Sequence, residues 1–207
     1  MHVLLLNGSP NAEGCTFTAL SEIAATLKAE NITSEIFQLG KKPVRGCIAC
    51  GVCHERGACA FQDDALPALV EAAKRADGIV IGSPVYYAGP NGALCALLDR
   101  FFFSSGNLLK FKPGAAVVSC RRGGASAAFD RLNKYFTINQ MPVASSQYWN
   151  SVHGFTPDDV RKDAEGLQTM RTLGRNMAWF LKLKRAGEDA GIERPAGEEL
   201  IYTDFIR

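Results

Sequence analysis

Residues 1–16 read MHVLLLNGSPNAEGCT, a short apolar run that passes directly into a loop of small and polar residues. The run at His2–Leu6 is continuously apolar at its centre, which is typical of a strand buried on both faces of a parallel sheet. Apolar residues then recur at helical spacing, at Phe17, Leu20, Ile23, Ala24 and Leu27. The opening of the chain therefore predicts a strand, an exit loop at 7–15 and a helix.

The same alternation continues along the chain. Further strands are expected at 34–39, 78–82, 115–119 and 143–148, and further helices at 64–76, around 94–102, at 126–138 and from Thr156 to about 184. Strands that alternate with helices predict an α/β fold, a three-layer sandwich with a five-stranded parallel sheet. No repeat or linker interrupts it, so we expect one domain over 1–207, with a cysteine-rich excursion at 40–62 and an irregular tail at 186–207.

Composition narrows the class of protein. The 207 residues carry a net charge of +2 and are 47% hydrophobic, which is ordinary for a globular protein. Such an even charge balance gives no electrostatic reason to expect nucleic acid or an anionic membrane as a partner. No apolar run approaches the roughly 20 residues of a membrane span, and no basic segment precedes the first apolar run, as it would in a signal peptide. We therefore expect a cytoplasmic protein.

The first exit loop has the character of an anion site. It joins a buried strand to the start of a helix, where free N–H groups and the helix dipole favour negative charge. Ser9, Asn11 and Thr16 add side-chain donors, and Gly8 and Gly14 allow a ligand to approach the backbone closely. The loop has neither the G-x-G-x-x-G nor the Gly-Lys-Ser/Thr pattern, so it fits a small phosphate without magnesium chemistry. An ordinary tight turn between strand and helix is the alternative.

Two further exit loops carry suitable groups. In 83–92, Pro84 stiffens the chain, and Tyr86 and Tyr87 offer ring faces for a flat isoalloxazine. The alternative is that one tyrosine covers the core and the other points to water. In SCRRGG at 119–124, Arg121 and Arg122 are candidates for the electron-rich end of a flavin or the phosphate of a nicotinamide cofactor, unless they form a solvated rim.

These loops together resemble a known family. GSPNAEGCT at 8–16, GSPVYYAGPNGALCALLDR at 82–100 and the Gly-rich turn at 123–124 are similar to the NAD(P)H-dependent FMN reductase family of the flavodoxin-like superfamily. The resemblance covers about residues 1–185, and the ending YTDFIR is also similar to tails in this branch. It implies a flavodoxin-like domain with FMN as cofactor. Here Cys15 replaces the more usual Ser or Asn of the phosphate loop.

The resemblance also implies site residues, carried over position by position. The FMN phosphate would lie at Ser9, Asn11, Gly14, Cys15 and Thr16. The ring would lie beside Pro84, Val85, Tyr86 and Tyr87, and its far edge beside Ser119, Arg121, Gly123 and Gly124. No acid–base side chain is assigned a catalytic role, because hydride transfer to a flavin requires none.

Four of the seven cysteines lie close together in sequence. Cys47, Cys50, Cys53 and Cys59 have the spacing C-x2-C-x2-C-x5-C, and no export signal accompanies them, so a disulfide framework is not expected. Four thiolates on a short loop suit a [4Fe–4S] cluster or tetrahedral zinc. A resemblance to iron–sulfur flavoproteins favours the cluster, which in that group exchanges single electrons with FMN. Cluster-free cysteines that pack as small hydrophobes are an equal alternative, since many members of the reductase branch carry a similar loop without a cluster.

One other chemistry fits the same segment. Cys50 and Arg56 have the C-x5-R spacing of phosphatase loops with a nucleophilic cysteine. That chemistry needs a strand before the cysteine and a helix that begins at the arginine, and neither is expected here.

Two principal functions follow, together with a weaker third. The first is an FMN-dependent oxidoreductase that takes a hydride from NAD(P)H and passes electrons to a small acceptor such as a quinone or a flavin. The second is an electron-transfer iron–sulfur flavoprotein with FMN and a [4Fe–4S] cluster, fed by ferredoxin. The third is a non-catalytic flavodoxin-like scaffold with an empty pocket. The resemblance also implies a homodimer or homotetramer.

Overall fold

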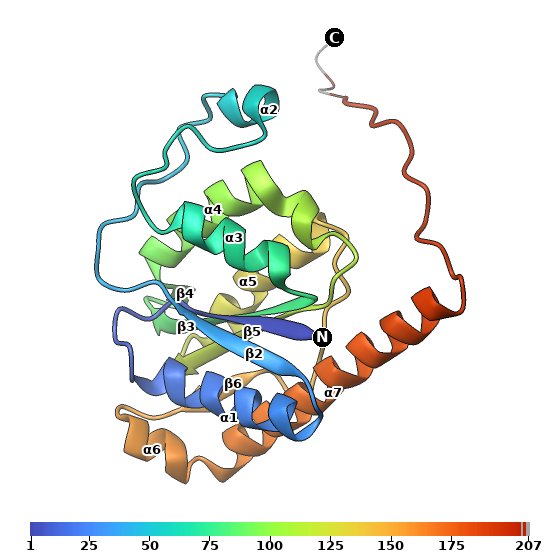
Figure 1. Cartoon of the computed structure of the whole chain (residues 1–207). Helices are drawn as coiled ribbons and strands as arrows, with labels where there is room; N and C mark the ends of the chain where they lie inside the picture. Colours follow the sequence, from blue (N-terminus) through green and yellow to red (C-terminus); the bar gives the residue numbers. More distant parts are fainter. Residues whose placement is uncertain (204, 206–207) are drawn as a thin grey trace.

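The computed structural model describes residues 1–203 and 205 and shows one twisted sheet between two layers of helices (Figure 1). The five parallel strands lie in the order β2-β1-β3-β5-β6. They are β1 (His2–Asn7), β2 (Thr33–Gln38), β3 (Gly78–Tyr86), β5 (Gly114–Cys120) and β6 (Ser151–His153). The short β4 (Gly89–Pro90) folds back antiparallel onto the end of β3. This strand order is that of flavodoxin, which confirms the expected α/β three-layer sandwich.

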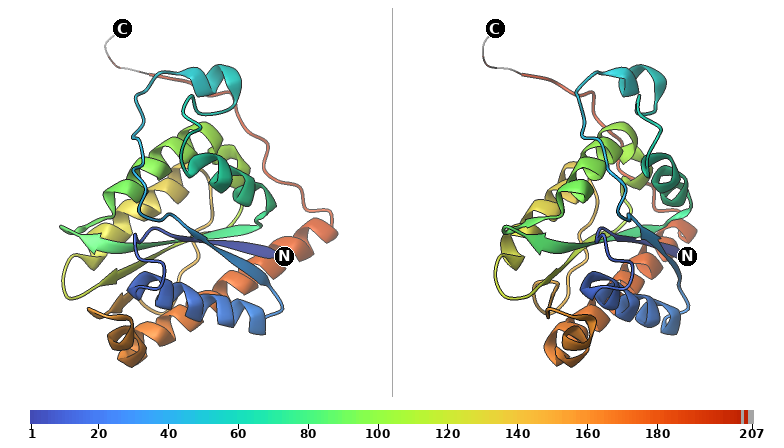
Figure 2. Two further views of the ribbon diagram at one scale, coloured as in Figure 1. Left: turned by 60° about the vertical axis from the view of Figure 1, so that its left-hand side comes forward. Right: turned by 90° about the vertical axis from the view of Figure 1, so that its left-hand side faces the viewer.

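The helices cover both faces of the sheet, and Figure 2 shows the sheet edge-on between the two layers. One layer holds α1 (Cys15–Ala29), α6 (Pro157–Lys162) and α7 (Ala164–Asp189). The other holds α3 (Leu66–Arg75), α4 (Gly92–Ser105) and α5 (Ala125–Ile138). The remaining helices are the short α2 (Val52–Arg56) and the 3-10 turn η1 (Gly106–Leu109).

The central strand β1 explains why both layers are needed. Its residues Val3 and Leu5 belong to the apolar core beside α1 and α7, while Leu4 and Leu6 belong to the core on the opposite face. All four are fully buried. Because successive side chains of a strand point to opposite faces, a continuous apolar run must be covered on both sides.

The strand predicted at 143–148 is wrong. Val143 makes only an isolated bridge to Gly114, and the paired strand is β6, at Ser151–His153. Between them the chain turns, with the Ser146 hydroxyl accepting from the Tyr148 N–H, and the aromatic residues Tyr148 and Trp149 are exposed. Tyr148 and Trp149 are therefore exposed aromatic residues at a turn and are not part of a strand.

The helix predicted from Thr156 to about 184 is two helices. Thr156 and Asp159 form a capping box that starts α6 as expected, but α6 ends at Lys162. Asp163 then caps a second helix by accepting from the Gly166 N–H, and that helix continues to Asp189. The irregular tail thus begins later than expected, at 190.

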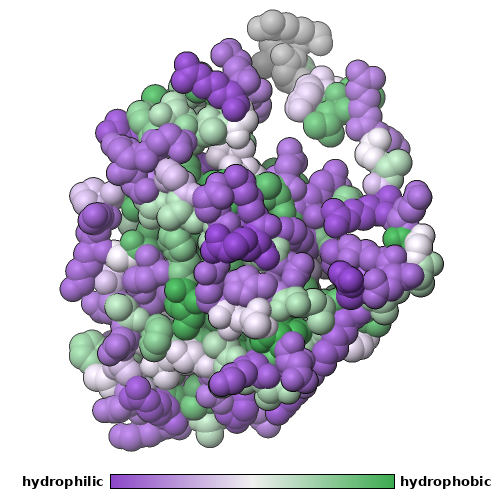
Figure 3. Space-filling view, in the orientation of Figure 1, coloured by the Kyte–Doolittle hydropathy of each residue, from purple (hydrophilic) through white to green (hydrophobic). Residues whose placement is uncertain are grey.

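The tail borders a depression of the body as far as Pro195, and beyond that it stands away from the body (Figures 1 and 3). Its apolar residues Leu200, Ile201 and Tyr202 are exposed. Three residues of the YTDFIR ending, Asp204, Ile206 and Arg207, lie outside the described residues. Within the part of the chain that is described, no helix combines the length and the apolar character that crossing a membrane would require.

The contact between α1 and α7 yields a test of the packing. A Cβ atom on Gly174 of α7 would lie 2.8 Å from the Thr26 Cβ of α1, whereas one on Gly187, in the same helix, would meet only Ile192 at 3.7 Å. Alanine favours a helix over glycine by about 1 kcal/mol, but overpacking costs about 1–3 kcal/mol. We expect Gly174→Ala to lower the free energy of unfolding measured in urea, and Gly187→Ala to leave it equal or slightly higher. Equal behaviour of the two variants would contradict the close approach of the helices.

Candidate functional site

The loops that follow β1, β3 and β5 surround one depression at the carboxyl edge of the sheet. Its volume is about 300 Å³, and such an edge, at the switch in strand order, is where open α/β sheets bind ligands. The residues that line it are Ser9, Asn11, Gly14, Cys15, Thr16, Pro84, Val85, Tyr86, Ser119, Cys120, Arg121, Gly154 and Phe155.

The amino end of α1 opens into this depression. The helix begins at Cys15, and no side chain of the described residues caps it at Gly14. The Thr18 N–H already bonds to the Gly14 carbonyl, at 3.0 Å, so the amides that precede it in the first turn remain available. Free amides at the amino end of a helix, together with the helix dipole, are suited to binding anions.

The loop that presents these amides is held from several sides. The Gly8 N–H donates to the Gly82 carbonyl of β3 at 2.8 Å. Asn91, the N-cap of α4, donates from Nδ2 to the Gly8 carbonyl at 2.7 Å and accepts from the Ala93 N–H at 3.0 Å. Gln38, at the end of β2, donates to the Ser9 carbonyl at 2.6 Å. The loop is therefore held by bonds from β2, β3 and the start of α4.

The second loop is a tight hairpin between β3 and β4. Tyr87 and Ala88 both have positive φ, 51° and 59°, which is the geometry of a type I′ turn. Non-glycine residues adopt it at a cost of about 1–2 kcal/mol each. Tyr86 borders the depression and is 47% exposed, whereas Tyr87 is fully exposed and does not border it. A ring face is thus available from one of the two tyrosines.

The third loop, which follows β5, contacts both the start of α1 and the β3–β4 hairpin. The Thr16 and Ser119 hydroxyls share a buried hydrogen bond of 2.8 Å, which joins α1 to the end of β5. Gly124 has a φ of +88°, and a Cβ atom there would lie 2.7 Å from the Ala88 Cα of the hairpin. The Gly-rich turn is therefore needed for the hairpin to pack against α5.

The two thiols in the depression are neutral. Burial raises the pKa of Cys15, against the smaller effect of a hydrogen bond with its own backbone. Burial likewise raises the pKa of Cys120. Because both thiols stay protonated at neutral pH, they neither repel a phosphate nor serve as nucleophiles.

Most of the residues expected from the sequence border this one depression. Ten of the thirteen do so, while Tyr87, Gly123 and Gly124 do not. The sequence interpretation missed Cys120, Gly154 and Phe155 as lining residues, and Asn7, Gln38 and Asn91 as the frame of the first loop. Asn91 carried a usable signal, because it precedes an apolar helical pattern as an N-cap.

The four clustered cysteines border a separate small cavity. Cys47, Cys50, Cys53 and Cys59 line it together with Phe61, Phe103 and Arg100, and its volume is about 20 Å³. In Figure 1 the segment that carries them rises from the end of β2 to α2, above α4. The Ala49 N–H donates to the Cys47 sulfur at 3.5 Å. The Arg100 Nε–H donates to the Cys59 sulfur at 3.4 Å.

Four cysteine thiols are a donor set that suits either an iron–sulfur cluster or tetrahedral zinc. In the described residues, no three Cys, His, Asp or Glu side chains converge as ligands of a single metal ion. N–H groups directed at cysteine sulfurs are among the means by which a protein tunes a cluster held by such sulfurs. The phosphatase interpretation fails, because no strand precedes Cys50 in residues 41–50 and Arg56 ends its helix instead of starting one.

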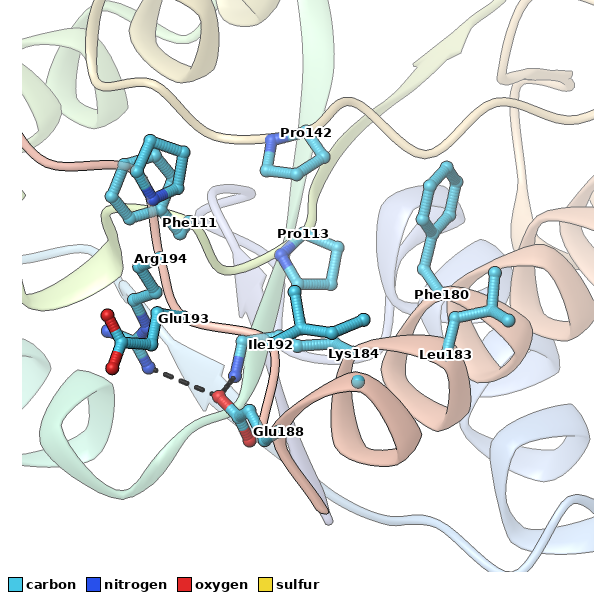
Figure 4. A pocket seen from close by; sticks show the side chains of 12 residues that line it. Phe111, Pro113, Pro142, Phe180, Leu183, Lys184, Glu188, Ile192, Glu193 and Arg194 are labelled. Atoms are coloured by element: carbon cyan, nitrogen blue, oxygen red, sulfur yellow. Dashed lines mark hydrogen bonds and ion pairs between the residues drawn. The ribbon is translucent and has the colours of Figure 1, made fainter. Parts of the chain in front are cut away.

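A second large depression lies at the opposite edge of the sheet (Figure 4). Pro113, immediately before β5, and the end of α7 border it. Both of its cations are paired, since Glu188 accepts from Lys184 and from Arg194. With paired charges at the amino ends of the strands, this depression is a poor candidate for a phosphate-bearing cofactor.

Comparisons with known proteins agree with this geometry. The profile of a family described as NADPH-dependent FMN reductase matches residues 1–156. An iron-sulfur flavoprotein of Methanocaldococcus jannaschii is 34% identical over 191 residues, which are 88% of this chain and 98% of that protein. An iron-sulfur flavoprotein of Methanosarcina thermophila is 28% identical over 197 residues, 91% of this chain and all of that protein.

Solved structures show the same fold. RosB with the bound intermediate 8-demethyl-8-formylriboflavin-5'-phosphate superimposes with a TM-score of 0.71 at 15% identity, covering all of this chain and 94% of RosB. A flavodoxin, WrbA-like protein from Agrobacterium tumefaciens gives a TM-score of 0.60 at 14% identity, covering 88% and 96% of the two chains. At such low identity these likenesses establish the fold alone.

Substitution of Asn91 tests the frame of the first loop. Asn91→Ala removes the cap of α4 and leaves the Gly8 carbonyl without its donor, and we expect the free energy of unfolding to fall by about 2–4 kcal/mol. Asn91→Ser keeps a cap but is too short to reach Gly8, so we expect a loss about 1 kcal/mol smaller. Chemical denaturation measures both, and equal losses would show that the cap contributes nothing.

Proposed function

The chain belongs to the NADPH-dependent FMN reductase family of flavin-binding oxidoreductases, and from this premise we propose that it is an FMN-dependent oxidoreductase. In this proposal it takes a hydride from NAD(P)H and passes electrons to a small acceptor such as a quinone or a flavin. One observation supports this most directly. The loops after β1, β3 and β5 line one depression, and the amino end of α1, which has no side-chain cap, borders it.

In this proposal the phosphate of FMN binds at Ser9–Thr16. The amides of the first turn of α1 donate to it, and the Ser9 and Asn11 region forms the rim. The Thr16 hydroxyl stays bonded to Ser119 and so fixes the distance between the first and third loops. Neutral Cys15 adds no charge beside the phosphate.

The ring of FMN would lie against Pro84, Val85 and Tyr86. Arg121, from the third loop, is the cation that borders the same depression and suits the electron-rich edge of the ring or a nicotinamide phosphate. Phe155 is 79% exposed at the mouth, where it offers a face for a second planar substrate. FMN, when bound, supplies the redox chemistry, and the chain supplies binding and orientation.

The cysteine cavity favours a second candidate function. All four predicted cysteines line one cavity, and several relatives carry the name iron-sulfur flavoprotein. In this version Cys47, Cys50, Cys53 and Cys59 hold a [4Fe–4S] cluster, and ferredoxin supplies the electrons instead of NAD(P)H. The cluster would supply single-electron exchange.

A charge placed at Asn11 tests the phosphate site. Asn11→Asp keeps the size of the side chain but puts a carboxylate on the rim beside the proposed phosphate. We expect FMN affinity, measured by quenching of flavin fluorescence, to fall at least about tenfold at low salt. Riboflavin has no phosphate, so its affinity serves as the control and is expected to stay unchanged. Equal losses for the two flavins would contradict the placement of the phosphate.

An anaerobic preparation separates the candidate functions. We expect flavin bands in the purified protein and, if the cluster is present, a broad absorbance near about 400 nm with acid-labile sulfide. Bleaching of the flavin by NADPH supports the first candidate, while bleaching only by reduced ferredoxin supports the second. A colourless protein whose melting temperature does not rise with added FMN would contradict both and leave a scaffold.

A further inference from the structure

Arg100 is a charged side chain in the interior of the protein. It lies on α4 between Asp99 and Phe101, and its side chain has no exposed surface. Burial of a charge is costly unless the charge is paired and its donors are all used. The partners that offset this cost are therefore informative about why an arginine is present at this position.

Each partner of Arg100 lies in the segment around the cysteines. Its Nη1 donates to the Asp64 carboxylate and, at 3.1 Å, to the Arg45 carbonyl. Its Nη2 donates to the Phe61 carbonyl at 2.7 Å, and its Nε donates to the Cys59 sulfur at 3.4 Å. The planar fork of a guanidinium can make these bonds simultaneously, which a lysine ammonium cannot.

These bonds close the cysteine loop at its base. Arg45 precedes the first of the four cysteines and Phe61 follows the last, so one side chain joins the two ends of residues 45–61. The other support of the loop is short and exposed: α2 is five residues long with none of them buried, and His54 makes an edge-to-face contact with Phe103 of α4. Asp64 reinforces the closure, since its other oxygen accepts from the Leu66 N–H at the start of α3.

The pair of Arg100 and Asp64 is charged. Burial by itself would raise the pKa of Asp64, but the hydrogen bond and the charge of Arg100, together with the backbone N–H groups of Leu66 and Arg45, outweigh this effect and hold the pKa below its ordinary value. The Asp64 carboxylate balances the guanidinium charge, and the Nε–H remains directed at Cys59.

We propose that Arg100 is a positioning residue that clamps the cysteine loop and donates a hydrogen bond to the Cys59 sulfur, and so holds and tunes the group that the four cysteines bind. The inference rests on the cluster of the second candidate function. A hydrogen bond to a ligand sulfur withdraws electron density from it, which raises the reduction potential of an iron–sulfur cluster. A closed loop also slows the release of iron.

Two variants test the clamp without an unpaired buried charge. Arg100→Lys keeps the charge but loses the fork. The double variant Arg100→Met with Asp64→Leu removes both charges and keeps apolar volume, a replacement that cores tolerate. Arg131→Met is the matched control, because Arg131 pairs with Asp99 in a half-exposed bridge away from the cysteines. Circular dichroism and FMN affinity confirm that each variant is folded.

The first readout needs no metal. In the iron-free protein, trypsin cleavage after the exposed Arg56 reports opening of the loop, and we expect at least about tenfold faster cleavage in the double variant. The second readout uses protein reconstituted with iron and sulfide. There we expect faster loss of iron to a chelator and a more negative reduction potential in both Arg100 variants, with no change in the control.

The outcomes test the role of Arg100 and the presence of a cluster independently. Failure of the wild-type chain to take up a cluster would refute the second candidate function, and the trypsin readout would then decide the clamp alone. Cleavage, iron loss and potential that all match the wild type in both variants would overturn the proposal. Faster cleavage with unchanged iron retention and potential would overturn the part that concerns the bound group.

Discussion

The contact between the first loop and β3 is the constraint on which the site depends. The Gly8 N–H bonds to Gly82, and Asn91 returns a bond to the Gly8 carbonyl, so the loop is fixed to the strand and helix beside it. This fixes where α1 begins, and therefore where its free amides point. If the loop sat elsewhere, the amino end of α1 would not share a depression with Pro84 and Ser119. The proposed phosphate site and the proposed ring site therefore both depend on how the loop after β1 is held.

The sequence predicted the central strands and the edge strand β2 but misplaced the edge strand β6, for a physical reason. β1, β3 and β5 are buried on both faces, and continuous apolar runs identify such strands. The edge strand β6 is three residues long, and the buried side chain of Asn150, just before it, bonds to the Ala116 carbonyl of β5 at 3.0 Å. A polar side chain that completes a sheet leaves no apolar pattern, so the strand prediction fell on the preceding segment, 143–148, which ends at the exposed Tyr148.

The site likewise contains residues that the sequence predicted and residues that it did not. Loop position and residue type were enough to predict which residues would gather at the carboxyl edge, because parallel strands bring their exit loops together. The frame was not predictable, since Gln38 and Asn91 contact the first loop from positions 29 and 83 residues away in the chain. Cysteine spacing likewise predicted that four cysteines would lie together, as they do around one cavity, but nothing in it pointed to Arg100, which contacts Cys59 and Phe61 because α4 passes beneath the loop.

The proposed site depends on phosphate binding at the amino end of α1 and on support of the ring by the neighbouring hairpin. A crystal structure of the protein grown with FMN tests both most directly. We expect phosphate density within hydrogen-bonding distance of the amides at Ser9–Thr16, with the ring beside Pro84–Tyr86. Ordered FMN at the opposite edge of the sheet, near Pro113, or an empty carboxyl edge at saturating FMN, would contradict it.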